Sequence, residues 1–255
     1  MTARRRSPIL LAAVGLVAAG AIAGAAGLAY LYLRPAPPPA VGLATAPPGS
    51  ISPAATGGGL PTSPSATNAP GTLDGTWTID RSVGSFSDFS SSFVGYRVNE
   101  TLAENRANTA VGRTPGVAGS LVLSGSTITS VQIVADLTNL QSDDQRRDGR
   151  VQQQALQTDQ FPRATFTLTS PIDLGSVPAD GATFTVSATG DLNLHGVTRS
   201  VTIPLEAHLS GDVVTVIGSI DIVFADYSIE RPTSFFVLSI EDHGIMEFQL
   251  YFRRD

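Results

Sequence analysis

The stretch TFTVSATGDLNLHGVTRSVTIPLEAHL, residues 183–209, decides the fold, because apolar and polar side chains alternate through it on both sides of one glycine turn. Such period-two alternation is typical of a strand with one buried and one exposed face. The turn at His195-Gly196 separates two long runs, so the stretch predicts a β-hairpin. In the first run the even-numbered positions form the apolar face, and we expect them to point into the protein.

The same alternation returns along the chain from about Gly71 to the C-terminus, and it gives eight or nine strands. A long antiparallel sheet with one apolar face has to pack on a second sheet or curl into a barrel. Closure into a barrel also removes exposed strand edges. The sequence therefore predicts an all-β protein, a single extended antiparallel barrel of about eight strands. A barrel of this size is filled by its own side chains or holds one small apolar ligand.

One segment, SDDQRRDGRVQQQALQTDQFPR, predicts a short helix beside the barrel. Ser142 with Gln145 three residues later forms a capping box, which places the start of the helix at Ser142. Val151 and Ala155 lie four residues apart and would seat the helix on the barrel. Pro162 is expected to end the helix and to turn the chain into the next strand.

The N-terminal part of the chain predicts a membrane anchor. Ile9–Leu33 holds no charged residue and is long enough to cross a bilayer. The arginines within residues 1–8 predict a cytoplasmic N-terminus and an exported C-terminal part, so we expect a single-pass protein of the cell membrane in a bacterial cell envelope. A signal peptide that is cleaved to release a secreted protein is the alternative.

Residues 34–70 are rich in Pro, Ala, Gly, Ser and Thr, a composition that cannot bury a core. We interpret them as a disordered tether that leads to a barrel domain at residues 71–255. After Arg34 the chain carries 12 basic and 22 acidic residues, a net charge of −10, which disfavours nucleic acid as a partner. The absence of cysteine excludes disulfides, thiolate metal sites and cysteine nucleophiles.

Two motifs together resemble the YceI-like family of proteins. In the first, Arg147-Asp148 opens a short helix and Phe161-Pro162 leads into a strand that begins with Thr165-Phe166. The second is the hairpin TGDLNLHGVTRSVTIPL. The resemblance covers about Gly75 to Arg254, and it departs from the family in a longer early hairpin and in the lack of a His after the Arg-Asp pair. It implies a lipocalin-like barrel, usually exported, with a long isoprenoid such as a polyprenyl phosphate or a quinone tail in an apolar channel.

From the alternation and the resemblance we predict which side chains meet such a tail and its head group. Glu100 and Arg199 fall on apolar faces near strand ends, and Arg147 suits a phosphate. The alternatives are that Glu100 and Arg199 lie at the rim or past a register shift, and that Arg147 forms a structural ion pair. The predicted channel residues are Phe166, Leu168, Phe184, Val186, Ala188, Leu192, Phe224, Phe248 and Leu250. The predicted mouth residues are Glu100, Arg147, Phe161 and Arg199.

Motifs for catalysis are not found in the sequence. His195, His208 and His243 lack metal-ligand spacing and are interpreted as exposed turn or surface residues, and neither a nucleophile elbow nor a phosphate loop occurs. We therefore expect a non-enzymatic carrier, store or sensor of an isoprenoid or other long-chain lipid, with no metal and no cofactor beyond that lipid. The alternatives are a cell-envelope interaction or stress protein with a solid barrel core and an enzyme acting on an apolar substrate. The sequence leaves the oligomeric state open.

Overall fold

The computed structural model describes residues 36–43, 73–234 and 237–255. The predicted anchor, Ile9–Leu33, and most of the predicted tether lie outside these residues. No helix within the described part of the chain is long and apolar enough to cross a membrane.

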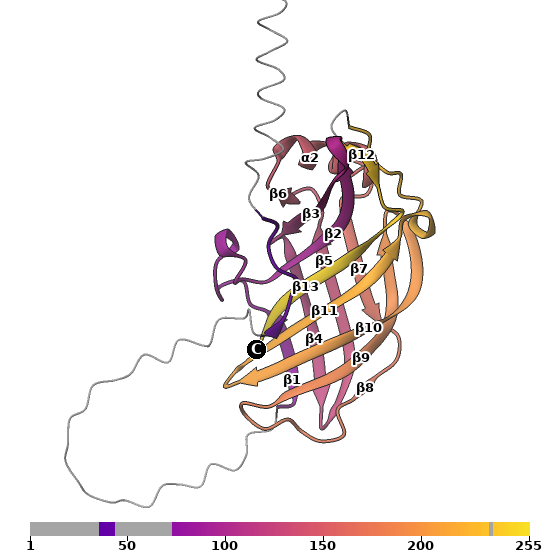
Figure 1. Cartoon of the computed structure of the whole chain (residues 1–255). Coiled ribbons are helices and arrows are strands. Elements are labelled where there is room, and N and C mark those ends of the chain that lie inside the picture. The colour runs from indigo at the N-terminus through magenta and orange to yellow at the C-terminus, as the bar shows by residue number, and fades with distance from the viewer. Residues whose placement is uncertain (1–35, 44–72, 235–236) are drawn as a thin grey trace, which may run out of the picture. The chain divides into compact units, whose positions relative to one another are not determined.

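Eight antiparallel strands close into a barrel in the order β1-β4-β5-β7-β9-β10-β11-β13, and β13 pairs again with β1 (Figure 1). The predicted all-β fold with about eight strands and one short helix is confirmed. The barrel strands are β1 (Gly75–Ile79), β4 (Val117–Ser124), β5 (Thr127–Asp136), β7 (Arg163–Leu168), β9 (Thr183–Leu194), β10 (Val197–Ser210), β11 (Val213–Val223) and β13 (His243–Arg254).

The hairpin of β9 and β10 follows the register that the sequence predicts. Leu194 pairs with Val197 across a two-residue turn, and both turn residues, His195 and Gly196, have positive φ. A two-residue turn with positive φ matches the right-handed twist of the two strands. Glycine is favoured in such a turn because it adopts positive φ without strain. Along β9 the odd-numbered positions from Thr183 to Asp191 are mostly exposed, whereas the even-numbered positions face the interior.

At one end the barrel wall is extended by strands outside the closed ring, and we call this the upper end, as it is drawn in Figure 1. β13 pairs with β1 near its C-terminus and with β2 through Ile245–Gln249. β2 then pairs with β3 and β12, and β3 pairs with β6. One further short strand, β8, lies at the lower end, where it pairs with the start of β5. These elements are β2 (Phe93–Leu102), β3 (Arg106–Thr114), β6 (Gln141–Ser142), β8 (Ile172–Asp173) and β12 (Val237–Ile240).

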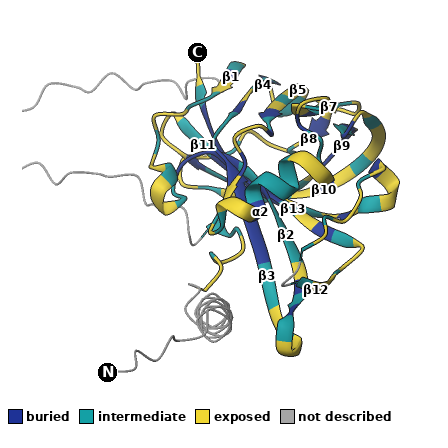
Figure 2. Ribbon diagram, turned by 90° about the horizontal axis from the view of Figure 1, so that it is seen from above, coloured by how far each residue is buried: buried dark blue, intermediate teal, exposed yellow. Residues whose placement is uncertain are grey.

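The predicted helix, α2 (Gln145–Arg150), lies over the upper end (Figure 2). Its N-cap is Asp144, whose carboxylate accepts from the backbone N–H of Arg146 at 2.9 Å, so the predicted start at Ser142 is wrong. The reason is that Ser142 pairs with Gly112 of β3 and is held in the sheet. Its hydroxyl instead contacts the Asp148 carboxylate at 2.5 Å.

The helix continues as a π-helical turn, η4 (Val151–Ala155), and ends there, so Pro162 does not set its end. Three further short turns are 3₁₀-helical: η2 (Phe86–Asp88), η3 (Ala103–Asn105) and η5 (Phe224–Tyr227). The main core cluster lies below the helix and includes Trp77, whose indole N–H donates to the carbonyl of Leu73 at 3.0 Å.

Candidate functional site

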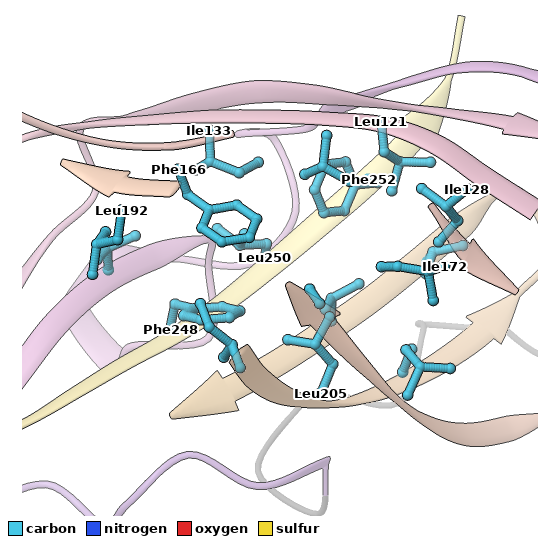
Figure 3. A pocket seen from close by; sticks show the side chains of 18 of the residues that line it. Leu121, Ile128, Ile133, Phe166, Ile172, Leu192, Leu205, Phe248, Leu250 and Phe252 are labelled. Carbon is cyan, nitrogen blue, oxygen red and sulfur yellow. The ribbon is translucent and has the colours of Figure 1, made fainter. Parts of the chain in front are cut away.

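Two cavities lie inside the barrel. The lower cavity has a volume of about 120 Å³ and is surrounded by β2, β4, β5, β7, β8, β9, β10, β11 and β13. Figure 3 shows this lining, with the ring of Phe166 projecting from β7 and the rings of Phe248 and Phe252 projecting from β13. Thr165 is the one polar residue among those that line it. Because the wall offers almost no hydrogen-bond partner, an apolar chain fits the lower cavity and water does not.

The upper cavity has a volume of about 150 Å³ and lies beneath α2 and η4. Val151, Ala155 and Leu156 line it, so the apolar side of the helical segment does seat on the barrel as the sequence predicts. Unlike the lower cavity, it also has charged lining residues, namely Glu100, Arg147 and Glu230. The interior therefore changes from apolar to partly polar toward the helix.

The two cavities share three lining residues, Val94, Ala164 and Met246, and we call this shared ring the junction. A volume of about 150 Å³ in an apolar protein interior accommodates a molecule the size of benzene. Each cavity by itself is therefore small, but the two lie in series. Met246 is unbranched and has three rotatable bonds, so it is the junction residue best able to adapt to a passing chain.

A buried ion pair forms the polar end of the upper cavity. Arg147 donates from Nη2 to Oε1 of Glu100 at 3.0 Å, and both side chains are less than a tenth exposed. A second ion pair joins Arg147 to Asp143, four residues earlier in the chain. Asn108 donates to the same Glu100 oxygen at 2.7 Å. Charge-assisted hydrogen bonds of this kind compensate for the loss of water around a buried charge.

The electrostatics of this end are set by carboxylates. Burial raises the pKa of Tyr96, and although Arg147 lowers it, the acids Asp148, Glu100 and Asp143 raise it further. Burial also raises the pKa of Asp148. Arg147 is thus one cation among several acids, and it is already bonded to two of them. The guanidinium is therefore already neutralised by its partners, and two carboxylates, Glu100 and Glu230, line the upper cavity beside it.

The predicted channel residues fall into three groups. Seven of them line the lower cavity: Phe166, Phe184, Val186, Ala188, Leu192, Phe248 and Leu250. Phe224 lines the upper cavity instead. Leu168 lines neither cavity; it is the last residue of β7, where the chain leaves the wall. That these side chains bind a ligand stays a prediction.

The predicted mouth residues do not all meet. Glu100 and Arg147 lie together at the upper cavity. Phe161 instead packs edge-on against the ring of His195, with centroids 4.5 Å apart. The Arg199 side chain is about half exposed near the hairpin end of β10, where it pairs with Asp226 at 3.1 Å. Arg199 is therefore a rim residue, as the alternative held, and Arg147 does form an ion pair.

His195 differs from its interpretation as an exposed residue. It is 6% exposed, and its Nδ1 lies 3.0 Å from the carbonyl oxygen of Tyr227. His243 is exposed as expected, and Thr183 contacts His208 at 3.1 Å on the outer face of the barrel. Among the described residues, no group of three or more His, Asp or Glu is placed to hold a metal ion.

Sequence reasoning missed the junction and the division of the interior into two cavities. Val94 and Met246 are visible in the alternation as inward residues, but alternation says nothing of where two walls approach each other. It also missed Asp143 as a partner of Arg147, although the spacing of four residues within a helical segment is a signal for an ion pair.

Comparison with known proteins finds one matching family and several solved structures with a similar fold. A family model described as the YceI-like domain matches residues 76–252. A polyisoprenoid binding domain from Saccharophagus degradans, implicated in plant cell wall breakdown, is 22% identical with a TM-score of 0.55; the match covers 70% of this chain and 98% of that one. BcnA from Burkholderia cenocepacia is 20% identical with a TM-score of 0.48, and the match covers 63% of this chain and 95% of that one. A Campylobacter jejuni YCEI protein is 14% identical with a TM-score of 0.47, and the match covers 56% of this chain and 84% of that one. None of the curated proteins matches the chain.

Proposed function

The chain belongs to the YceI-like domain family, and on this premise we propose that it binds a lipid, holding the long apolar tail of an isoprenoid along the two cavities of its barrel. One observation carries the proposal: the lower cavity is lined by apolar side chains with Thr165 as the one exception. The similarity to a polyisoprenoid binding domain supports the choice of an isoprenoid over other apolar ligands.

The energetics allow such a complex. Each buried methylene contributes about 0.8 kcal/mol, so the roughly 12 carbons that two benzene-sized cavities hold gain about 10 kcal/mol before costs. Association costs ~4–15 kcal/mol in lost freedom. Because the walls make dispersion contacts and offer almost no hydrogen bonds, the tail is selected by its length and thickness.

The head group at the upper cavity is uncharged under this proposal. A phosphate would have to compete for Arg147 with Glu100 and Asp143, both already ion-paired to it. Glu230 adds another carboxylate to the same lining. By contrast, a hydroxyl can donate or accept hydrogen bonds there, and a quinone carbonyl can accept them. Neither group brings negative charge toward the carboxylates.

The first experiment is lipid extraction of the purified full-length protein followed by mass spectrometry. We expect a stoichiometric isoprenoid. A barrel with a solid core, acting as an interaction or stress protein, yields none. The variant Ala188→Trp places a large ring in the lower cavity, where Ala188 is 3% exposed. Its matched control is Asp191→Trp on the exposed face of the same strand. We expect the first variant to lose most of the lipid and the control to retain it; equal retention would refute the placement of the tail.

A second experiment tests the head group. The protein is offered a polyprenyl alcohol and the corresponding polyprenyl phosphate with the same tail, and both affinities are measured at fixed salt. We expect the alcohol to bind at least about tenfold more tightly, which corresponds to roughly 1.4 kcal/mol. Tighter binding of the phosphate would contradict the assignment of an uncharged head but not the binding of the tail.

We also propose that the barrel works outside the cytoplasm on a membrane anchor. The uncharged run Ile9–Leu33 and the preceding arginines support this. N-terminal sequencing of the protein from the membrane fraction tests it, and a mature N-terminus inside or after that run would replace the anchor with a cleaved signal peptide.

A further inference from the structure

The outer face of β13 is buried where a barrel surface would ordinarily meet water. Glu247, Gln249 and Tyr251 alternate with the inward-facing residues of this strand, yet their exposures are 0%, 2% and 2%. Part of the cover is the loop before β2, because Gln249 donates to the carbonyl of Ser91 at 3.1 Å. The rest of the cover is a short segment, residues 38–43, which we call the strap.

Two buried charges, Arg113 and Glu247, and one partly buried charge, Arg97, lie beneath the strap. Arg97 donates from Nε to Oε2 of Glu247 at 2.7 Å. Arg113 donates from Nε and Nη2 to the other carboxylate oxygen at 3.0 and 2.7 Å. The Arg113 guanidinium also lies over the rings of Phe89 and Phe93, at 4.6 and 4.3 Å from their centroids. The Glu247 carboxylate thus holds both guanidinium groups in position, and the two rings further fix that of Arg113.

Each of these arginines directs a remaining N–H at the strap. Arg97 donates from Nη2 to the carbonyl of Pro38, and Arg113 donates from Nη2 to the carbonyl of Pro39 at 2.9 Å. Guanidinium groups are donors only, and prolines present a carbonyl but no N–H. The two arginine donors of the surface therefore meet acceptors on the strap.

Beyond the prolines the strap reaches β10 and β11. Val41 lines a shallow hollow with Pro204 and Glu206 of β10 and with Ile217 of β11. Ile217 is 5% exposed although it lies on the outer face, in register with Gln249. An apolar residue at the hollow thus follows the two carbonyl contacts along one extended run of chain, as in the recognition of proline-rich segments.

We propose that the outer face of β3, β2, β13 and β11 is a binding surface for an extended proline-rich segment, and that the strap occupies it as a ligand built into the same chain. Residues 38–43 fall within the predicted disordered tether, and that prediction differs from the structure at these positions. Through the contacts of Pro38 and Pro39 with the two arginines, the strap is held against the barrel wall. Because it is part of the same chain, its effective concentration at the surface is high.

Cross-linking of the full-length protein tests whether the strap is docked. The chain contains no cysteine, so the pair Val41→Cys and Ser219→Cys, both at the hollow, can be joined by a short bifunctional maleimide. The control pairs Val41→Cys with Thr198→Cys, an exposed position on the outer face of β10. Thr198 is six residues from Pro204, about 20 Å along the strand. We expect the first pair to cross-link within one chain at least about tenfold faster than the control.

A second variant tests the role of the prolines. Pro38→Gly with Pro39→Gly removes the stiffness that the proline rings give the strap. We expect it to slow the cross-linking of the Val41–Ser219 pair several-fold, whereas Pro47→Gly with Pro48→Gly in the same proline-rich run leaves the rate unchanged. Equal rates for the two cysteine pairs, or no effect of the Pro38 and Pro39 substitutions, would overturn the proposal. Cross-links between two chains would also overturn it, because a second copy would then supply the strap.

Discussion

Replacing Arg147 by Met removes a cation from buried carboxylates at the upper cavity. Glu100 is 7% exposed and loses an ion pair of 3.0 Å. Breaking a buried pair by removal of one partner costs about 3–5 kcal/mol. Since Asn108 still donates to Glu100 at 2.7 Å, we expect the lower value, about 3 kcal/mol. A domain of this size loses roughly 2–4 °C per kcal/mol, so the melting temperature should fall by about 6–12 °C.

The neighbouring residue supplies a matched control. The Arg146 side chain is 68% exposed, and its ion pair with Asp144 is long, at 3.6 Å. Because such an exposed pair contributes little, Arg146→Met should change stability by no more than about 0.5 kcal/mol. Adding Glu100→Gln to Arg147→Met should recover part of the loss, because an amide accepts from Asn108 without an unpaired charge. Melting is followed by circular dichroism. If Arg147→Met melts within about 2 °C of Arg146→Met, or if Glu100→Gln adds a further full loss, the reasoning is refuted.

Three further predictions concern the barrel wall and pH. Phe184→Asp, on the face that lines the lower cavity, should lower the melting temperature far more than Thr185→Asp on the exposed face; equal losses would contradict the assignment of faces. Gly190→Ala should destabilise by about 1–3 kcal/mol, because a Cβ there would lie 2.4 Å from a backbone oxygen, whereas Gly149→Ala in open helical space should stabilise by about 0.5–1 kcal/mol; chemical denaturation measures both. Hydrogen bonds from Ser82 and Arg253 lower the pKa of Asp80 from 3.8 to about 2, so its stabilising effect is present above pH 3.8 and disappears as pH falls through about 2. The difference in melting temperature between wild type and Asp80→Asn should therefore shrink over that interval, and a constant difference would disprove the linkage.

The sequence by itself determined the barrel wall, because inward and outward positions follow from a local rule. Successive side chains of a strand point to opposite faces, so the even-numbered residues of β9 could be assigned inward from their chemistry alone. The two-residue turn at His195-Gly196 fixed the register of the hairpin in the same local way. Alternation does not reveal that β7 ends at Leu168, so the position of this residue relative to the two cavities could not be predicted from the sequence.

The polar features were decided by tertiary structure. Glu100 and Arg147 are 47 residues apart in sequence and meet only because α2 lies over β2. The start of that helix was displaced for the same reason, since pairing of Ser142 with β3 prevented it from acting as the cap.

On the outer face of β13, alternation predicts that Glu247 is exposed to water, yet it is fully buried. Its neighbours Arg97 and Arg113 come from other strands, and its cover includes Pro38 and Pro39 from a segment more than 200 residues earlier. A local pattern says which face of a strand a residue occupies; which distant segment covers that face depends on the closed barrel.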